Sequence, residues 1–297
     1  MKIENIIIPN AEVNSRLDHF LKRHKPEWPY GLIARWCRQK KIKLNNVRTS
    51  PGARLELNDK LTLPLDSDPQ PQSTSSQQTL TKAQRIFFER LIIHQDDKLV
   101  VINKPPGLAT QGGTGIATSV DQLASAYFKG TDNKEAFIVH RLDRSTSGIL
   151  LISKDLVLTK ELTQAFKDKT IKKTYIALVE GHLSESSGTI NSPLSIQNNQ
   201  SEKVVIDADG KPAITHFKLL EHQGPNSLVQ LMPETGRMHQ LRVHMASLGH
   251  PIIGDDKYAR AREQFKFNPE LEKRLYLHAY RIEIPHLQQA FTVSSGW

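Results

Sequence analysis

A single aspartate stands between two arginines just before an apolar run. The segment His140–Arg144 carries Asp143 between Arg141 and Arg144, and the branched apolar residues of Gly148–Ile152 follow it. Such a run predicts a buried strand, so the polar segment would be a loop held at the edge of a rigid scaffold. The nearby positive charges favour the charged form of the carboxyl, so we expect Asp143 to be ionised. An ionised carboxylate in a polar loop can bind a metal, form a salt bridge or act as a nucleophile, and these residues alone leave the three open, with the salt bridge favoured.

Two further segments contain residues of types that can take part in catalysis. Thr174–Val179 predicts a strand with Tyr175 at its start, where a tyrosine usually packs in a core. Further along, Arg237 precedes a predicted helix that ends at Gly249. The apolar residues that predict this helix by their spacing are Met238, Leu241, Met245 and Leu248.

Two other patterns suggest ligand sites that their spacing then disfavours. His239 and His244 are five residues apart, which does not place two ligands on one helical face as a spacing of four does. His250 and the pair Asp255–Asp256 add no better spacing, so we expect no metal site. The glycine-rich stretch Gln111–Gly115 lacks the Lys-Ser/Thr ending of a phosphate loop and the spacing of a dinucleotide loop, so we expect no nucleotide cofactor.

The composition indicates a basic protein of ordinary size with a polyanionic partner. The chain has 297 residues and a formal net charge of +9, and nucleic acid is the commonest polyanion that such proteins bind. Cys37 is the single cysteine, which excludes internal disulfides and a cysteine-based zinc site and fits a reducing compartment. No apolar run approaches the roughly 20 residues of a membrane span. We therefore expect a soluble, cytoplasmic protein that does not enter a membrane.

The N-terminal residues 13–64 predict a small unit of helices and short strands. Ser15 is expected to cap a helix that begins at Arg16, and a second helix is expected over Gly31–Gln39. Lys40–Leu44 and the residues from Val47 onward predict two strands joined by an Asn45-Asn46 turn. Leu55–Leu63 alternates around an Asn-Asp turn and predicts another pair of strands.

The same unit holds a run of basic residues. From Arg35 to Arg48 the chain has six basic residues and no acidic one, so a helix and a strand would share one positive face, for phosphates or merely for solvent. This arrangement resembles the small RNA-binding domain named after ribosomal protein S four. The resemblance implies RNA contacts from Arg16, Arg35, Arg38, Lys40, Lys41 and Lys43.

The chain divides into two domains at a polar stretch. Residues 66–81 contain almost nothing apolar, which predicts a flexible tether. We therefore expect an N-terminal domain over 1–65, a linker over 66–84 and a second domain over 85–297. In the second domain we expect an amphipathic helix within 155–169 and strands over 99–103, 174–179, 228–231 and 274–284.

Several segments of the second domain resemble the RluA-type ribosomal pseudouridine synthases. His140–Asp143 followed by Thr146–Gly148 resembles the active-site signature of that family. The resemblance continues over roughly residues 90 to 286, in the segments Asn103–Gly107, Lys173–Val179, Thr235–Arg242, Gly249–Asp255 and Arg274–Ile284.

The resemblance implies a fold, an activity and a set of site residues. It implies an α+β fold with a mixed, mainly antiparallel sheet. It also implies that the protein isomerises uridine to pseudouridine in RNA, that its partner is the large-subunit ribosomal RNA, and that it acts as a monomer without cofactor or metal. It also implies that Asp143 acts as nucleophile or as the base that removes a sugar proton, that Arg237 pairs with it, and that Tyr175 removes the proton from the ring carbon. The residues implied to bind substrate are His140, Arg141, Arg144, Lys104, Gln240 and Arg242, with Arg141 filling the space of the flipped uridine. The alternatives are an inactive RNA-binding ribosome-assembly factor and a hydrolase or glycosylase, which would release uracil.

Overall fold

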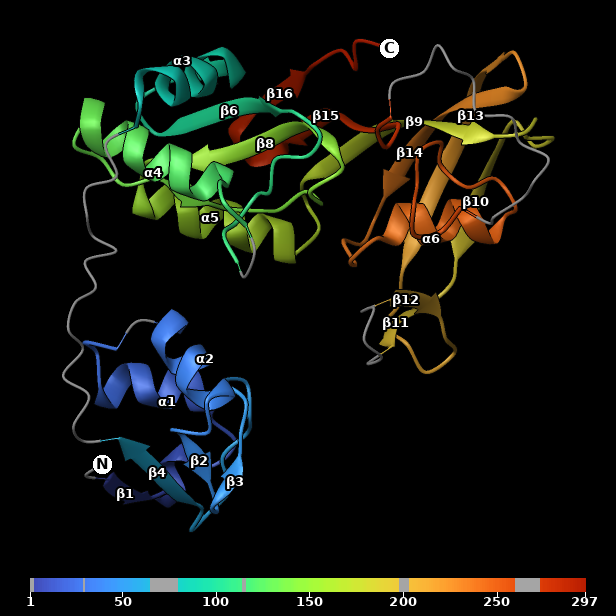
Figure 1. Ribbon diagram of the computed structural model, residues 1–297. Helices are drawn as coiled ribbons and strands as arrows, with labels where there is room; N and C mark the ends of the chain where they lie inside the picture. Colours follow the sequence, from blue (N-terminus) through green and yellow to red (C-terminus); the bar gives the residue numbers. More distant parts are fainter. Residues whose placement is uncertain (1–2, 29, 65–79, 114–115, 198–202, 260–272) are drawn as a thin grey trace. The chain divides into compact units, whose positions relative to one another are not determined.

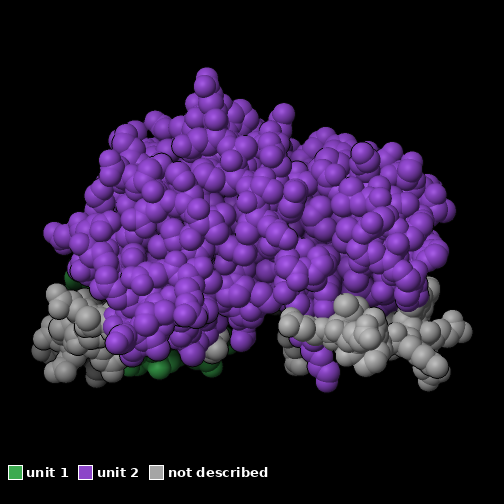
Figure 2. Space-filling view, turned by 90° about the horizontal axis from the view of Figure 1, so that it is seen from above, with its two compact units in different colours: residues 1–77 green, residues 78–297 purple. Residues whose placement is uncertain are grey.

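The chain folds into two compact units. The structure is a computed structural model, and it describes residues 3–28, 30–64, 80–113, 116–197, 203–259 and 273–297. The units comprise residues 1–77 and 78–297 (Figures 1 and 2). No helix in the described part of the chain is long and apolar enough to cross a membrane.

The first unit packs two helices against a four-stranded antiparallel sheet. A short 3-10 turn, η1 (Asn10–Glu12), precedes helices α1 (Leu17–His24) and α2 (Tyr30–Arg38). The sheet has the order β1-β4-β2-β3, and its strands are β1 (Ile3–Ile7), β2 (Lys43–Leu44), β3 (Val47–Arg48) and β4 (Lys60–Pro64). Phe20 of α1, Trp36 of α2 and Leu61 of β4 meet in one buried core. The two helices predicted for this unit are therefore confirmed.

Several details of the first unit differ from the sequence prediction. Arg16, not Ser15, is the residue before α1, and its side chain caps no backbone group of the helix. The strand expected from Lys40 begins only at Lys43, because Lys40 has a left-handed backbone with φ 58°. The Asn45-Asn46 turn is confirmed, with φ values of 52° and 63°. Strand β1 was not predicted, because its partner β4 lies at the other end of the unit.

The second unit begins earlier than residue 85. The expected linker 66–84 lies largely outside the described residues, but its last part is folded. Leu80 packs on a buried core, and helix α3 (Lys82–Leu91) starts behind Thr81. Thr81 and Gln84 form a capping box, in which each side chain accepts a hydrogen bond from the backbone of the other. This reciprocal cap places the start of the helix inside the segment that composition alone assigned to the linker.

A single large sheet runs through the second unit. Its main strand order is β10-β13-β14-β9-β15-β8-β6-β5, with β16 paired to β15 and β7 paired to β8. All of these pairs are antiparallel except the short parallel contact of β15 with β8. The mixed, mainly antiparallel sheet is therefore confirmed. Its strands are β5 (Ile92–Gln95), β6 (Leu99–Lys104), β7 (Phe137–Ile138), β8 (Ser147–Ser153), β9 (Lys172–Glu180), β10 (Ser187–Asn191), β13 (Ile214–Gln223), β14 (Asn226–Pro233), β15 (Leu277–Ile284) and β16 (Gln289–Thr292).

Helices cover both faces of the β6–β8 part of this sheet. Val100 and Ile102 of β6 point to the face covered by α3 and by α4 (Val120–Thr131). Leu99 and Val101 point to the opposite face, which α5 (Leu156–Lys167) covers (Figure 1). Because both faces are buried, β8 is apolar along its whole centre, as a strand between two layers should be.

The other half of the sheet carries the last helix. Leu241 and Met245 of α6 (Gln240–Ser247) pack on buried residues of β9 and β14. A separate hairpin, β11 (Leu194–Gln197) with β12 (Lys203–Ile206), joins this half, and Figure 1 shows it beyond α6. A 3-10 turn, η2 (Pro285–Leu287), connects β15 to β16. The strand β9 runs through the middle of the sheet and therefore has neighbours from both halves.

Candidate active site

A cavity opens between the loop before β8, the start of β9 and the approach to α6. Its volume is about 190 Å³. The loop, the strand and the helix thus bring together residues that are about one hundred positions apart in the chain. The cavity is lined by Arg141, Leu142, Asp143, Thr146, Lys173, Tyr175, Pro233, Thr235, Gly236, Arg237, Met238, His239, Gln240, Leu241, Arg242 and Leu277.

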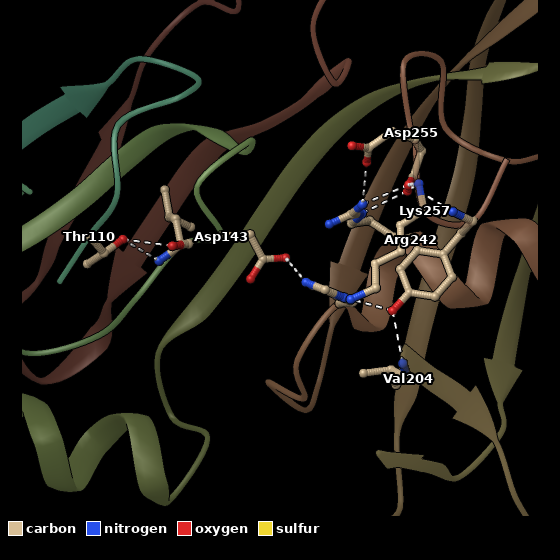
Figure 3. A network of polar contacts seen from close by, with 10 residues as sticks. Thr110, Asp143, Val204, Arg242, Asp255 and Lys257 are labelled. Atoms are coloured by element: carbon tan, nitrogen blue, oxygen red, sulfur yellow. Dashed lines mark hydrogen bonds and ion pairs between the residues drawn. The ribbon is translucent and has the colours of Figure 1, made fainter. Parts of the chain in front are cut away.

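The loop that carries Asp143 is held at both ends. Thr110 Oγ1 donates a hydrogen bond to the carbonyl of Leu142 at 2.7 Å and accepts one from its N–H at 3.1 Å (Figure 3). On the other side, Gly148 has φ 110°, and a Cβ there would lie 2.4 Å from the carbonyl oxygen of Ala279. Only glycine therefore lets β8 reach β15 directly after the loop. The predicted loop at the edge of a buried strand is confirmed.

Lys104 supports this loop from beneath and does not line the cavity. It is fully buried, and its Nζ donates to the carbonyl oxygens of Pro105, Leu108 and Arg144 at 2.9 to 3.2 Å. Burial lowers the pKa of Lys104 to about 7, while the charge of Asp143 raises it. The position of Lys104 does not support the expected substrate contact, because three carbonyl oxygens already accept hydrogen bonds from its ammonium group.

His140 is also a structural residue. Its Nε2 accepts a hydrogen bond from the N–H of Leu151 in β8 at 2.9 Å, and its ring stacks on Phe166 with centroids 4.5 Å apart. Burial and, to a smaller extent, the charge of Lys173 lower the pKa of His140 to about 3. The residue does not line the cavity, so its expected role in substrate binding is not supported by its position.

The two arginines beside Asp143 point to different places. Arg141 is exposed and lines the cavity, as a residue that contacts substrate would. Arg144 donates from Nε to the carbonyl oxygen of Gly107 at 2.9 Å and lines a neighbouring groove with Lys257 and Arg274. Of the pair, Arg141 alone lines the cavity that contains Asp143.

Tyr175 lies on β9 with its ring between two buried cores. It packs against both the β9–β14 core and the core under α3 and α4, and it lines the cavity opposite the Asp143 loop. Burial raises the pKa of Tyr175, and the charge of Asp143 raises it further, so the hydroxyl stays protonated at neutral pH. Among the described residues no hydrogen bond occupies that hydroxyl. Packing and chemistry, the two readings that the sequence left open, are thus compatible.

The arginines around α6 are arranged differently from the prediction. Arg237 is exposed, and its Nε donates to the carbonyl oxygen of Pro212 at 3.1 Å. Within the described parts of the chain no ion pair joins Arg237 to Asp143. Arg242 is buried instead, and Asp255 accepts two hydrogen bonds from its guanidinium at 2.7 Å (Figure 3). Both arginines line the cavity, but the one with a fixed geometry is Arg242.

Gln240 joins the segment before α6 to β13. Its Oε1 accepts hydrogen bonds from Thr235 Oγ1 and from the N–H of Arg237, and its Nε2 donates to the carbonyl oxygen of Ile214. It lines the cavity, yet it is buried and its amide is engaged on both sides. Its geometry indicates that it shapes the cavity wall.

One polar residue that faces Asp143, His239, was not predicted as a site residue. His239 Nε2 lies 3.8 Å from Asp143 Oδ2, and His239 Nδ1 lies 2.7 Å from the hydroxyl of Tyr258 (Figure 3). The position of His239 between Arg237 and Arg242 was the one available signal, whereas nothing in the sequence relates Tyr258 to Asp143. The other two histidines have separate partners, His244 with Thr215 and Ser192 and His250 with Glu180.

The basic residues expected to bind RNA in the first unit lie mostly at its surface. Arg35, Arg38 and Lys40 are exposed, and Lys41 and Lys43 are half-buried. Arg16 forms an ion pair with Asp18 at 2.7 Å. The exposed side chains at the end of α2 and before β2 are accessible to phosphates. The side chain of Arg16 is instead paired with Asp18 in the first turn of α1.

Comparisons with known proteins give the family. The model of the family described as RNA pseudouridylate synthase matches residues 98–247, which include Asp143, Tyr175 and Arg242. The chain belongs to this family. It is also 39% identical to the ribosomal large subunit pseudouridine synthase C of Rickettsia felis, over 93% of this chain and 90% of that protein. Its identity to the protein of the same name from Vibrio cholerae is 34%, over 96% and 90% of the two chains.

Solved structures of the family have the same fold as this synthase. The human RNA pseudouridylate synthase domain containing 4 is 26% identical, with a TM-score of 0.60 over 71% of this chain and 92% of that chain. The human RNA pseudouridylate synthase domain containing 1 is 29% identical, with a TM-score of 0.56 over 69% of this chain and 82% of that chain. The predicted family and the predicted enzyme class, an isomerase that acts on uridine in RNA, are therefore confirmed.

Proposed function

We propose that this synthase converts specific uridines of large-subunit ribosomal RNA into pseudouridine, in the cytoplasm and as a monomer. The observation that carries the proposal is the similarity to relatives named for that RNA, which extends over nine-tenths of both chains. The cavity around Asp143 supports it, because Asp143, Tyr175 and Arg242 all line it. The net charge of +9 suits an RNA partner.

Asp143 is the residue that begins the reaction. Isomerisation requires that the bond between uracil N1 and the sugar breaks and that the sugar is rejoined to ring carbon 5. A carboxylate at the sugar can add to carbon 1′ as a nucleophile or remove the proton from carbon 2′. Asp143 suits either step, because its loop is fixed by Thr110 and its carboxylate faces the cavity. The reaction rearranges bonds within one nucleoside, so it needs no cofactor or metal ion to balance it.

Tyr175 removes the proton from carbon 5 after the new bond has formed. Its raised pKa keeps it a phenol, so its oxygen can take that proton only while its own proton leaves to an acceptor. Asp143 is the nearby anion whose charge acts on the hydroxyl, and it is free to accept the proton once the sugar has been transferred. The proton then passes from Asp143 to uracil N1, which became anionic when its bond to the sugar broke, so the carboxylate is restored and the nucleoside is neutral. Asp143 and Tyr175 would thus act one after the other on the same nucleoside.

Arg242 is the arginine that supports Asp143, in place of Arg237. Asp255 holds the guanidinium of Arg242 by two hydrogen bonds, so its charge stays fixed beside the cavity. Arg237, which is exposed and lines the same cavity, is placed to contact RNA together with Arg141. Buried and bidentate arginines give orientation, whereas exposed ones give attraction to phosphates.

The first unit supplies further RNA contacts. Its exposed residues Arg35, Arg38 and Lys40 follow one another from α2 toward β2, in a unit that resembles the ribosomal protein S four domain. A tethered second binding unit raises the local concentration of the catalytic unit at the same RNA. We therefore assign binding to residues 1–65 and catalysis to the second unit.

The test is to map pseudouridines in large-subunit ribosomal RNA from cells with and without this protein. We expect one or a few positions to remain uridine in its absence and to be restored by the purified protein acting on the transcript. An inactive assembly factor would bind the transcript and leave every uridine unchanged. A glycosylase would release free uracil, which the isomerisation does not produce.

A further inference from the structure

A chain of polar contacts leads from the β11–β12 hairpin to Asp143. The N–H of Val204 in β12 donates to the hydroxyl of Tyr258 at 3.1 Å, and that hydroxyl lies 2.7 Å from Nδ1 of His239. Nε2 of His239, on the other side of the ring, lies 3.8 Å from Oδ2 of Asp143 (Figure 3). Tyr258 and His239 have no place in the reaction steps described above.

The chain has a direction. A phenol has one proton, and its oxygen already accepts the N–H of Val204, so the proton is available to Nδ1 of His239. Nδ1 then accepts, and the ring proton of the neutral imidazole lies on Nε2, which faces Asp143. Burial lowers the pKa of His239, and Arg242 and Lys257 lower it further against the opposing charges of Asp143 and Asp255. The ring is therefore neutral at pH 7, and a neutral donor orients a carboxylate without cancelling its charge.

The backbone of His239 supports a special role. His239 is the residue before α6 and has a left-handed conformation with φ 53° and ψ 16°, which is uncommon for a residue other than glycine. Its side chain caps no backbone group of the helix, so capping does not explain it. Its ring is held edge-on against Tyr258, with centroids 5.5 Å apart. Arg242 and Asp255 fix Tyr258 in turn, through the face of its ring and through its backbone N–H.

We propose that His239 is a positioning residue for Asp143, set by Tyr258 so that its Nε2–H holds Oδ2 and directs the other carboxylate oxygen toward the uridine. The proposal rests on the assigned activity at Asp143. The separation of 3.8 Å is longer than a hydrogen bond, and contacts of this kind commonly shorten when the substrate is bound. Asp255 thereby orients Arg242 and Tyr258 together.

Four variants of the full-length protein test this role. His239→Gly deletes the ring at a backbone conformation that glycine prefers, so it leaves the fold intact. His239→Gln keeps an N–H donor where Nε2 stands and cannot titrate. Tyr258→Phe keeps the ring of His239 and removes the group that fixes its tautomer. His182→Gln changes an exposed histidine of the same unit and is the matched control.

The measurement is the single-turnover release of tritium from a large-subunit ribosomal RNA transcript labelled at uridine carbon 5. A misplaced catalytic group costs about 100-fold in rate, so we expect that loss in His239→Gly with RNA affinity unchanged. His239→Gln should recover a large part of the rate, and Tyr258→Phe should be intermediate. A rate in His239→Gly within about threefold of wild type, or a loss in affinity alone, would overturn the proposal.

A second measurement does not depend on activity. The pKa of His239, followed by NMR of its ring, should fall when Asp143→Asn removes the charge that opposes the other causes. An unchanged pKa in that variant would show that the ring does not face Asp143 and would overturn the proposal even if the transcript is no substrate. An inactive wild-type protein with the expected pKa change would instead count against the assigned activity alone.

Discussion

The two units of this protein use basic residues in opposite ways. In the first unit Arg35 and Lys40 are exposed to solvent, so phosphates can approach them. In the second unit Lys104 and Arg242 are buried. Lys104 donates hydrogen bonds to three carbonyl oxygens, and Arg242 donates to the Asp255 carboxylate. Exposed cations provide attraction that salt weakens, whereas buried cations provide geometry. Changes at the buried cations of the second unit should therefore alter rate or stability, and changes at the exposed cations of the first unit should alter RNA affinity.

The largest effect is expected from Asp143→Asn. The amide keeps the shape of the side chain and removes the charge that both proposed first steps require, so turnover should fall to background. RNA affinity should not fall, because the variant removes a negative charge and leaves the arginines that line the cavity unchanged. Single-turnover conversion and RNA binding measured on the same preparation check this. Asp97→Asn, an exposed change of equal charge, is the control, and activity in Asp143→Asn within tenfold of that control would refute the assignment.

Tyr175→Phe should have the next largest effect. The ring and its packing remain, so the fold should survive with a loss of stability of about 1 kcal/mol or less. Conversion should slow by roughly 10²–10⁴-fold, as expected when a general base is lost. Quantifying pseudouridine after a single turnover, together with thermal unfolding, distinguishes a catalytic role of Tyr175 from a role in core packing. A normal rate in the variant would leave Tyr175 with core packing only.

The two arginines at α6 provide a direct contrast between a buried and an exposed cation. Arg242→Lys keeps the charge but loses the two-point contact with Asp255, so we expect at least a tenfold loss in the maximal rate. Arg237→Gln should lower the maximal rate less than about threefold and raise the Michaelis constant, because an exposed contact contributes mainly to binding. Steady-state kinetics over a range of RNA concentrations up to saturation give the maximal rate and the Michaelis constant of both variants. The reverse result would restore Arg237 as the partner of Asp143.

The sequence predicted the local elements better than the contacts between them. The apolar run of β8 and the spacing in α5 and α6 sufficed for those elements, because burial on a sheet or helix face dictates the residue pattern. The loop with Asp143 and the nearby Tyr175 were predictable from motifs. The start of α3 was missed because a polar capping box and a polar linker have the same composition.

The partners of the site residues were not predictable in the same way. Three basic or polar residues in recognisable motifs, Lys104, His140 and Arg237, have partners other than those expected. Each pairs with a backbone group, and a sequence does not reveal which carbonyl or N–H a side chain will meet. The contact of Tyr258 with His239 depends on the turn around Asp255, which lies beyond α6 in the chain.

In the first unit the expected effect is on salt dependence. Replacing Arg35 and Lys40 by Gln should weaken RNA binding and flatten the slope of log affinity against log salt by up to about 0.7–0.9 per lost phosphate contact. The maximal rate at saturating RNA should stay the same. The control makes the same charge change at two exposed lysines of the second unit, Lys129 and Lys160. An equal flattening in the control would mean that only total charge matters, and a lower maximal rate would mean that the first unit shapes the catalytic cavity.

Among the changes considered, replacement of His140 should have the smallest effect on activity. Its effect on the pH dependence of stability should be clear. Its pKa is lowered from 6.5 to about 3 by burial, so between these values the unfolded chain binds a proton that the folded protein does not. Stability should therefore fall as the pH drops below about 6.5, at up to about 1.4 kcal/mol per pH unit. The physical reason is local, because Nε2 accepts the N–H of Leu151 and cannot do so when protonated.

The matched variant is His140→Gln, whose amide oxygen can accept the same N–H and does not titrate. Denaturant unfolding at pH 7 and at pH 5 should give a fall in stability that is smaller in the variant by about 1 to 2 kcal/mol. The rate of conversion at pH 7 should be nearly that of wild type, since His140 lies outside the cavity lining. An equal pH dependence in both proteins would show that His140 is protonated in the fold, and a large loss of rate would return it to the substrate-binding residues.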